Sequence, residues 1–252
     1  MSGPSIDSRG IGDLAFALDS EANVTQPTYL LVHGAWGGAW CWDEVVKELD
    51  SRGALWRTVN LPSSQIGIDP KSDLDVDENV VAEAANGVEG SAVLVGHSYA
   101  GAVITQAAPS VNRLDSLFYI AATVPDIGQS HSDTARLVRV RTEMDSAIHL
   151  DGDMLRLDIE PAALALYQES TPELRGWAKS RLSTQTLASF RGARTATSVD
   201  VPSRYVLCRN DHALDPTLQD LVSKRCDDVI EIESDHCPFL SHSVQLVDIL
   251  LN

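Results

Sequence analysis

The stretch Ala92-Val-Leu-Val-Gly-His-Ser-Tyr-Ala-Gly101 decides the fold class. It places the pattern G-x-S-x-G directly after an apolar run and directly before residues 99–108, which have a helical pattern. A serine at such a strand-to-helix turn lies on strained backbone, so small residues must flank it. Its hydroxyl would project from a sheet at a helix N-terminus, which stabilises negative charge on a substrate. We therefore predict that Ser98 is a nucleophile; the alternative is a serine that only caps the helix.

Apolar runs alternate with helical patterns on both sides of this stretch. Strands are expected at 29–33, 54–59, 92–95, 117–121, 205–208 and 229–232. Helices are expected from about 42 to 49, at 76–88, at 99–108 and at the end of the chain, where Leu240, Val244, Val247 and Leu251 would share one face. Continuous apolar strands that alternate with helices favour a mostly parallel sheet flanked by helices on both faces. The sequence therefore predicts one α/β domain over residues 28–252.

Residues 125–192 interrupt this alternation. They contain helix-like pieces at 161–169 and 172–182, each of which begins with a proline. More than sixty residues are too many for a simple crossover between two strands, so we predict a helical cap inserted over the end of the sheet. Its large apolar side chains indicate either an apolar pocket or packing of the cap on the core. They are Leu164, Leu166, Tyr167, Trp177 and Leu182.

The composition excludes several classes of partner. With 19 Lys+Arg against 36 Asp+Glu, the formal net charge is −17, which disfavours nucleic acids and anionic membranes. Residues 1–27 form a polar N-terminal extension with one possible short strand at 13–18 and no signal-peptide pattern. The four cysteines form no C-x-x-C pair, and Cys41 and Cys208 are expected to be buried thiols. We expect a cytoplasmic protein that acts on small molecules; a homodimer is left open.

A second turn after a strand offers a hydrogen-bond donor. His33-Gly34-Ala35-Trp36 follows the strand at 29–33, and Gly34 allows close approach of the backbone. Acyl transfer needs two N–H donors for the tetrahedral oxyanion. The backbone amides of Tyr99 and Ala35 are the candidates. Three nearby tryptophans are more typical of packing than of ligand contact: Trp36, Trp40 and Trp42.

A serine nucleophile needs a histidine base, and seven histidines compete. Five are assigned elsewhere: His33 and His97 to the two turns, His131 and His149 to the cap, and His242 to the last helix. Between the remaining His212 and His236, only His236 directly follows the last strand. We therefore predict that His236 is the base.

The base needs a carboxylate that fixes its tautomer, and in α/β hydrolases this acid lies between the serine and the histidine in sequence. The loop after residues 205–208 offers Asp211 and Asp215. Asp215 precedes Pro216, so a helix N-cap explains it fully. We favour Asp211, with Asp215 and Asp126 as alternatives.

Four segments carry a resemblance to a known family. They are Leu30–Trp42, Val93–Gly101, Tyr205–Leu214 and Asp235–Ser241. In this order and spacing the chain resembles the α/β-hydrolase superfamily, and within it the branch of small plant methylesterases, hydroxynitrile lyases and bacterial esterase relatives. The resemblance implies a triad of Ser98, Asp211 and His236, an oxyanion hole at Ala35 and Tyr99, and no cofactor or metal.

The resulting expectation is a serine hydrolase that cleaves small carboxylic esters through an acyl-enzyme. A carbon–carbon lyase of the hydroxynitrile type and a non-catalytic small-molecule receptor on the same fold are the alternatives. Lyases of the branch commonly carry a polar residue after the histidine of the first turn, and some carry a lysine after the catalytic histidine. Gly34 and Cys237 occupy these positions here, which favours the hydrolase.

Overall fold

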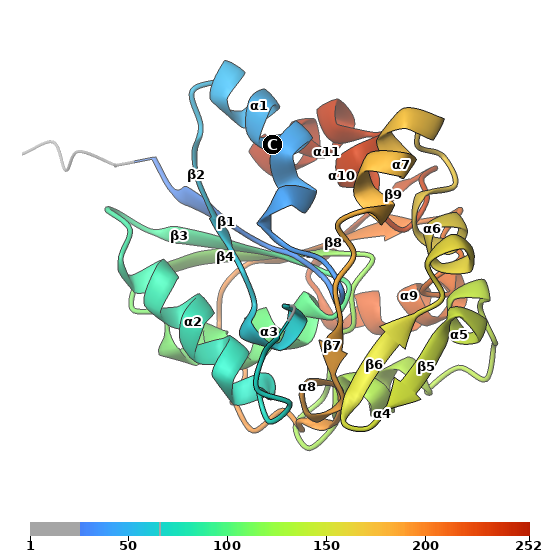
Figure 1. Ribbon diagram of the computed structural model, residues 1–252. Helices are drawn as coiled ribbons and strands as arrows, with labels where there is room; N and C mark the ends of the chain where they lie inside the picture. Colours follow the sequence, from blue (N-terminus) through green and yellow to red (C-terminus); the bar gives the residue numbers. More distant parts are fainter. Residues whose placement is uncertain (1–25, 66) are drawn as a thin grey trace, which may run out of the picture.

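A computed structural model describes residues 26–65 and 67–252, so the possible strand at 13–18 lies outside the described residues. Its central element is a six-stranded sheet in the order β2-β1-β3-β4-β8-β9, in which each neighbouring pair is parallel (Figure 1). The strands are β1 (Thr28–Val32), β2 (Leu55–Val59), β3 (Ala92–His97), β4 (Leu114–Ile120), β8 (Ser203–Cys208) and β9 (Asp228–Ile232). The predicted parallel sheet is confirmed.

The burial of the strands follows their apolar content. Every residue of β1 and of β3 is buried, because helices cover both faces of the sheet at its centre. In the edge strands β2 and β9 only the last residue is buried, and both strands carry charged residues such as Arg57 and Glu231. Charges on an edge strand hinder pairing with a further strand.

The helices form two layers (Figure 1). On one face lie α1 (Asp43–Ser51) and α11 (Ser243–Leu251), which pack together, and on the other lie α2 (Leu74–Asn86) and α3 (Ala100–Ala107). Helix α9 (Pro216–Val222) connects β8 to β9. The strand order reverses beside β1, so the loops that leave β1 and β3 diverge and open a crevice at the carboxyl ends of the strands.

The last helical region differs from the prediction of a single helix. A short helix α10 (Pro238–Ser241) ends at His242, whose φ of −137° and ψ of 38° are not helical, and α11 begins after it. Because of this break, the residues on the buried face of α11 differ from those predicted for one continuous helix. Val244 is 51% exposed, and the buried face of α11 is formed by Leu246, Val247 and Leu250.

Between β4 and β8 the chain forms the predicted cap, but the cap is not purely helical. Its elements are α4 (His131–Ala135), α5 (Glu143–Ala147), β5 (Ile148–Asp151), β6 (Met154–Leu157), α6 (Ile159–Tyr167), α7 (Pro172–Lys179), β7 (Gln185–Thr186) and α8 (Leu187–Arg191). The three strands form an antiparallel sheet, β5-β6-β7. A two-residue turn that begins at Gly152, with a φ of 60°, joins β5 to β6. Glycine tolerates this backbone, so the Gly152-Asp153 pair is a hairpin signal that the helical expectation missed.

Two further properties concern the whole described chain. Within residues 26–65 and 67–252, no helix is long and apolar enough to cross a membrane. The four cysteines are free thiols, and Cys41 and Cys208 are buried as predicted.

Candidate active site

Ser98 lies at the turn between β3 and α3, where its φ of 55° is in the left-handed region. Such a backbone is strained for a residue with a side chain and persists only where its surroundings hold it. Helix α3 starts against the segment after β4, and a Cβ on Gly101 would lie 2.3 Å from the carbonyl oxygen of Thr123. The predicted close passage of backbone at this turn is therefore confirmed. The turn presents the Ser98 side chain to the main cavity.

His236, in the loop after β9, is hydrogen-bonded to Asp211, in the loop after β8. The Nδ1 atom of His236 lies 2.7 Å from Oδ2 of Asp211, and both residues are buried. Asp211 also accepts hydrogen bonds from the backbone amides of Ala213 and Leu214, at 2.7 and 2.8 Å, and from Nε2 of Gln219, at 2.8 Å. Several donors hold the carboxylate in one orientation, so the imidazole ring is oriented as well.

The two alternative acids have other partners. The side chain of Asp215 caps α9 by accepting a hydrogen bond of 2.8 Å from the backbone amide of Thr217. Asp126 is exposed and forms an ion pair with Arg225 at 2.6 Å. The structure therefore brings Asp211, and neither alternative, to the histidine.

The backbone amides of Ala35 and Tyr99 lie in the loop after β1 and at the N-cap of α3. Among the described residues, neither amide makes a hydrogen bond. A Cβ on Gly34 would lie 2.7 Å from Nδ1 of His97 and 2.9 Å from Cβ of Ser98, so the loop approaches the serine only because residue 34 is glycine. Two unused N–H donors beside a serine can stabilise an oxyanion.

Two further histidines stabilise the loops. His97 Nε2 donates a hydrogen bond of 2.9 Å to the carbonyl oxygen of His236, and the two rings lie 4.6 Å apart. His33 connects its own turn to Leu61, whose amide lies 3.1 Å from His33 Nε2. Burial lowers the pKa of His33 to about 4 and that of His97 well below its ordinary value, with the nearby His236 contributing to the latter. Both rings are therefore neutral near pH 7.

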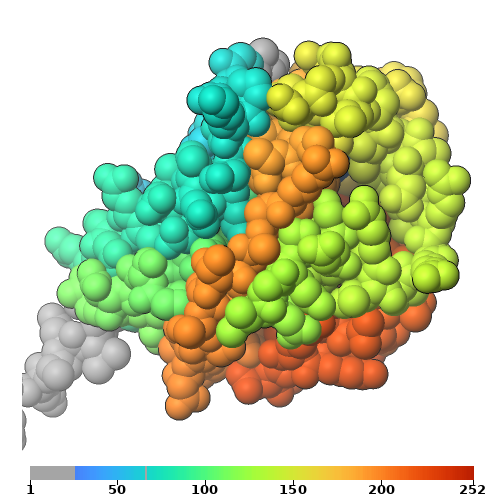
Figure 2. All heavy atoms as spheres, turned by 90° about the horizontal axis from the view of Figure 1, so that it is seen from below, coloured from blue at the N-terminus to red at the C-terminus, as the bar shows by residue number. Residues whose placement is uncertain are grey.

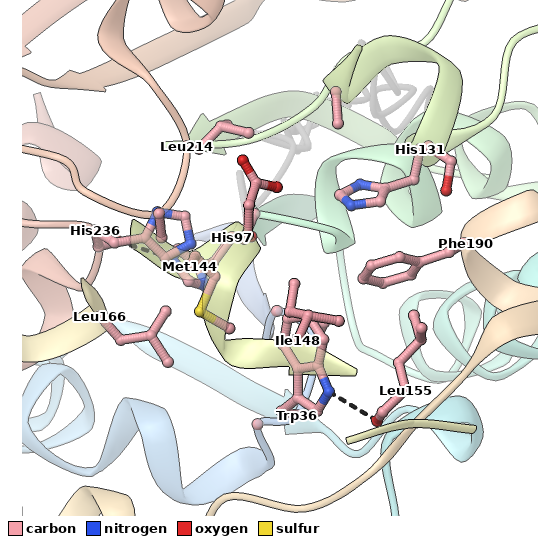
Figure 3. A pocket seen from close by; sticks show the side chains of 18 of the residues that line it. Trp36, His97, His131, Met144, Ile148, Leu155, Leu166, Phe190, Leu214 and His236 are labelled. Carbon is pink, nitrogen blue, oxygen red and sulfur yellow. Dashed lines mark hydrogen bonds between the residues drawn. The ribbon is translucent and has the colours of Figure 1, made fainter. Parts of the chain in front are cut away.

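The cavity that contains Ser98 and His236 has a volume of about 800 Å³ (Figure 3). Its wall is mostly apolar, and the cap contributes Met144, Ile148, Leu155, Leu166, Tyr167, Leu187 and Phe190. Of the cap residues proposed for an apolar pocket, Leu166 and Tyr167 line it, Leu164 is 51% exposed, and Trp177 and Leu182 pack on the core.

Of the three tryptophans expected to serve in packing rather than ligand contact, Trp36 packs edge-on against Phe190, with ring centroids 5.6 Å apart, and it also borders the cavity. Its ring lines the cavity, and its Nε1 donates a hydrogen bond of 3.0 Å to the carbonyl oxygen of Leu155 in the cap (Figure 3). Trp42 is buried in the core, and Trp40 packs edge-on against Trp177 with ring centroids 5.3 Å apart. Trp36 has a positive φ of 57° and precedes the short helix Ala39–Trp42, which contains the other two tryptophans.

His131 is a pocket residue that the sequence did not single out. It lies at the start of α4, packs against Phe190 with ring centroids 4.2 Å apart, and faces the cavity (Figure 3). Its Nδ1 lies 2.9 Å from Oγ1 of Thr123. Burial, with a smaller contribution from His236, lowers the pKa of His131 to about 3, so the ring is neutral near pH 7. A histidine in an irregular cap segment has no local sequence signal that would have identified it.

A buried polar network joins the two oxyanion-hole segments to the cap. The hydroxyl of Tyr99 donates a hydrogen bond of 2.8 Å to the buried Asp77, which also accepts from the amide and hydroxyl of Ser63. Gln185 of β7 donates to Ser63 Oγ at 2.8 Å and accepts from the amide of Trp36 at 3.4 Å. The carboxylate of Asp77 is thus surrounded by donors.

The described residues contain no group of three or more His, Cys, Asp and Glu side chains that could hold a metal ion. What the site offers is a serine at a strained turn, a buried His–Asp pair and two free amides around one cavity. These are the parts that acyl transfer requires.

Comparisons with known proteins identify the family of the chain. The model of the alpha/beta hydrolase family matches residues 29–249. Alpha/beta hydrolase nvfD of Aspergillus novofumigatus is 28% identical over 173 residues, which cover 64% of this chain and 68% of that protein. Methylesterase 7 of Arabidopsis thaliana is 24% identical, over 90% of this chain and 95% of its own length. A solved pyrethroid hydrolase from Sphingobium faniae JZ-2 shares the fold with a TM-score of 0.78 at 22% identity, over 90% of this chain and 96% of that one.

Proposed function

This chain belongs to the alpha/beta hydrolase family, and we propose that it cleaves small carboxylic esters through an acyl-enzyme formed on Ser98. Relatives that are named esterases and hydrolases support ester hydrolysis as the reaction class. The observation that carries the mechanism is the buried hydrogen bond between Asp211 and His236, in the cavity that also contains the strained Ser98.

The proposed reaction has two steps. Oγ of Ser98 attacks the ester carbonyl while Nε2 of His236 accepts the hydroxyl proton, and Asp211 stabilises the resulting imidazolium. The oxyanion accepts hydrogen bonds from the amides of Ala35 and Tyr99. The carbon–oxygen bond then breaks, and His236 returns the proton to the leaving alcohol. In the second step a water molecule, activated by the same base, releases the acid and restores Ser98.

A fluorophosphonate probe tests this proposal directly, because only an activated serine attacks phosphorus readily. We expect stoichiometric labelling of Ser98 in the native protein, with loss of both labelling and ester turnover in Ser98→Ala. Ser132→Ala is the matched control, since Ser132 lines the same cavity from the cap and should keep both properties. Folded native protein that is not labelled, or is labelled at another serine, would overturn the proposal.

A further inference from the structure

The segment Arg136-Leu-Val-Arg-Val-Arg141 connects α4 to α5 in the cap. Its three arginines line the same cavity as Ser98 and His236, and each of them is exposed. They therefore lie at the mouth of the cavity. Figure 2 shows the surface of the cap hollowed between its green and yellow segments. We call Arg136, Arg139 and Arg141 the arginine rim.

The arginine rim has no ion-pair partner within 4 Å in the described part of the chain. By contrast, Arg209 pairs with both Asp220 and Glu231. Other exposed arginines that lack an ion pair, such as Arg113 and Arg181, donate hydrogen bonds to backbone carbonyl oxygens, whereas the rim arginines make no side-chain hydrogen bond among the described residues. The rim arginines are thus free to bind an anion from solution.

The carboxylates near the arginine rim are already engaged. Asp133 accepts hydrogen bonds from the amide and hydroxyl of Ser130, at 3.0 and 2.7 Å, in the capping box of α4. Asp145 does the same for Thr142 at the start of α5, with its amide at 2.8 Å. Asp145 is also the only carboxylate among the described residues that line the cavity, against three arginines. The capping carboxylates keep their negative charge, but among the described side chains that line the cavity the three arginines outnumber the one carboxylate, so the charge of the lining at the mouth is positive.

Apart from the arginine rim and Asp145, no Asp, Glu, Lys or Arg among the described residues lines the cavity. The side chains around Ser98 are apolar or neutral, and burial keeps His131 uncharged near pH 7. A ligand that matches the whole cavity would place an apolar body between the serine and the arginine rim and an anionic group at the mouth. Arginine guanidinium groups bind carboxylates and similar anions through paired hydrogen bonds.

We propose that this enzyme prefers esters that carry an anionic group on the acyl or alcohol part, remote from the ester bond. The proposal rests on the proposed function and names its substrate class. Because the rim is exposed, solvent and salt screen each contact, so the expected preference is about tenfold at low ionic strength. It should appear mainly in KM, because the anionic group does not take part in the reaction.

Pairs of esters that differ only in charge test the preference. For the acyl side, the mono-4-nitrophenyl ester of suberic acid is compared with its terminal carboxamide analogue. For the alcohol side, the hexanoate ester of 3-(4-hydroxyphenyl)propanoic acid is compared with that of the corresponding propanamide, because two methylene groups then separate the charge from the leaving phenol. The measured quantity is the ratio of kcat/KM between the carboxylate and the carboxamide, at low salt and again at 0.5 M NaCl, where the Debye length is roughly 4 Å.

We expect a ratio of about ten on at least one side, which falls towards one at high salt and in the triple variant R136Q/R139Q/R141Q. A second triple variant, R113Q/R156Q/R181Q, removes the same charge from exposed arginines that do not line the cavity, and it should keep the ratio. A ratio near one in the wild type, or an equal loss in both triple variants, would overturn this inference alone. If no ester of any charge is hydrolysed, the proposed function fails and this inference fails with it.

Discussion

The central sheet and the cap border the same cavity, but they hold their residues in different ways. Strands β1 and β3 are completely buried, and the loops that follow them are fixed by buried hydrogen bonds such as that between His97 and His236. In the cap, three of the four residues of β5 are exposed, and the arginine rim has no partner among the described residues. Rigid surroundings suit groups that must react, because a small displacement costs much of the rate.

This division suggests that the two regions contribute different terms to catalysis. Changes on the sheet side should act on kcat, since they disturb groups that touch the reacting atoms. Changes in the cap should act on binding or on stability. Each of the following experiments compares positions in one region, in both, or at the seam between them.

The largest effect is expected at Asp211. Asp211→Asn should lower kcat by roughly 10⁴, because an amide favours the wrong tautomer of His236. Asp215→Asn, four residues away, should change unfolding by about 1 kcal/mol or less and leave kcat nearly unchanged, since asparagine also caps helices well. Steady-state kinetics and denaturant titration of both variants provide the measurement. A greater loss of kcat in Asp215→Asn would show that the acid is misassigned.

Sequence analysis predicted more of the sheet than of the cap, and this difference also follows from how each region holds its residues. Ser98, Asp211 and His236 could be predicted because each follows a recognisable strand of a parallel sheet, and the carboxyl ends of such strands meet at one edge. The cap strands β5, β6 and β7 are only four, four and two residues long, too short for a clear period of two. The pairing of β5 with β6 is a local hairpin, whereas β6 pairs with β7, which is distant in sequence.

The roles of Trp36 and His131 were missed for a related reason. Whether a side chain faces a cavity depends on the direction of one irregular loop, and no local pattern encodes that direction. Trp36 lies on a loop with a positive φ, and the position of His131 depends on contacts with Thr123 and with Phe190, which is distant from it in sequence.

Asp77 lies at the seam between the two regions, and its pKa predicts a pH-dependent stability. Burial raises this pKa from its ordinary value of 3.8 to about 6. The folded protein therefore retains the proton to higher pH than the unfolded chain does. The resulting stabilisation is complete below about pH 4 and is lost as the pH rises through about 6, with a total of about 3 kcal/mol.

Asp77→Asn removes this titration. Between pH 4 and pH 7 the wild type should lose roughly 2 kcal/mol of this stability relative to Asp77→Asn, as measured by urea unfolding at each pH. Asp75→Asn, on the exposed face of the same helix, should follow the wild type. A difference between Asp77→Asn and wild type that does not vary with pH would show that Asp77 is ionised with an ordinary pKa in the folded protein.

A pair of glycines compares packing on the two sides. A Cβ on Gly101 would lie 2.3 Å from the carbonyl oxygen of Thr123 and 2.8 Å from Cβ of Ala122, whereas a Cβ on Gly176 of α7 would meet no atom within 4 Å. Gly101→Ala should therefore destabilise the protein by about 1–3 kcal/mol, because the elbow and the segment after β4 must move apart. Gly176→Ala should stabilise it by up to about 1 kcal/mol, because alanine favours the helix. The measurement is the melting temperature of both variants. Equal changes in melting temperature would contradict the predicted difference in packing between the two glycines.

The smallest effect is expected with cyanohydrins, which should not be cleaved above the spontaneous rate. A lyase of the related branch uses a polar side chain after the histidine of the first turn, and a Cβ on Gly34 would already clash with His97 and Ser98. A positive charge after the catalytic histidine would stabilise departing cyanide, but Cys237 is buried, and burial raises the pKa of its thiol well above the ordinary value, so it remains neutral. The arginine rim is positive but lies at the cavity mouth, away from the serine. Benzaldehyde release from mandelonitrile is measured beside hydrolysis of 4-nitrophenyl esters by the same protein. Cyanohydrin cleavage as efficient as that of the best ester would replace the hydrolase assignment with that of a lyase.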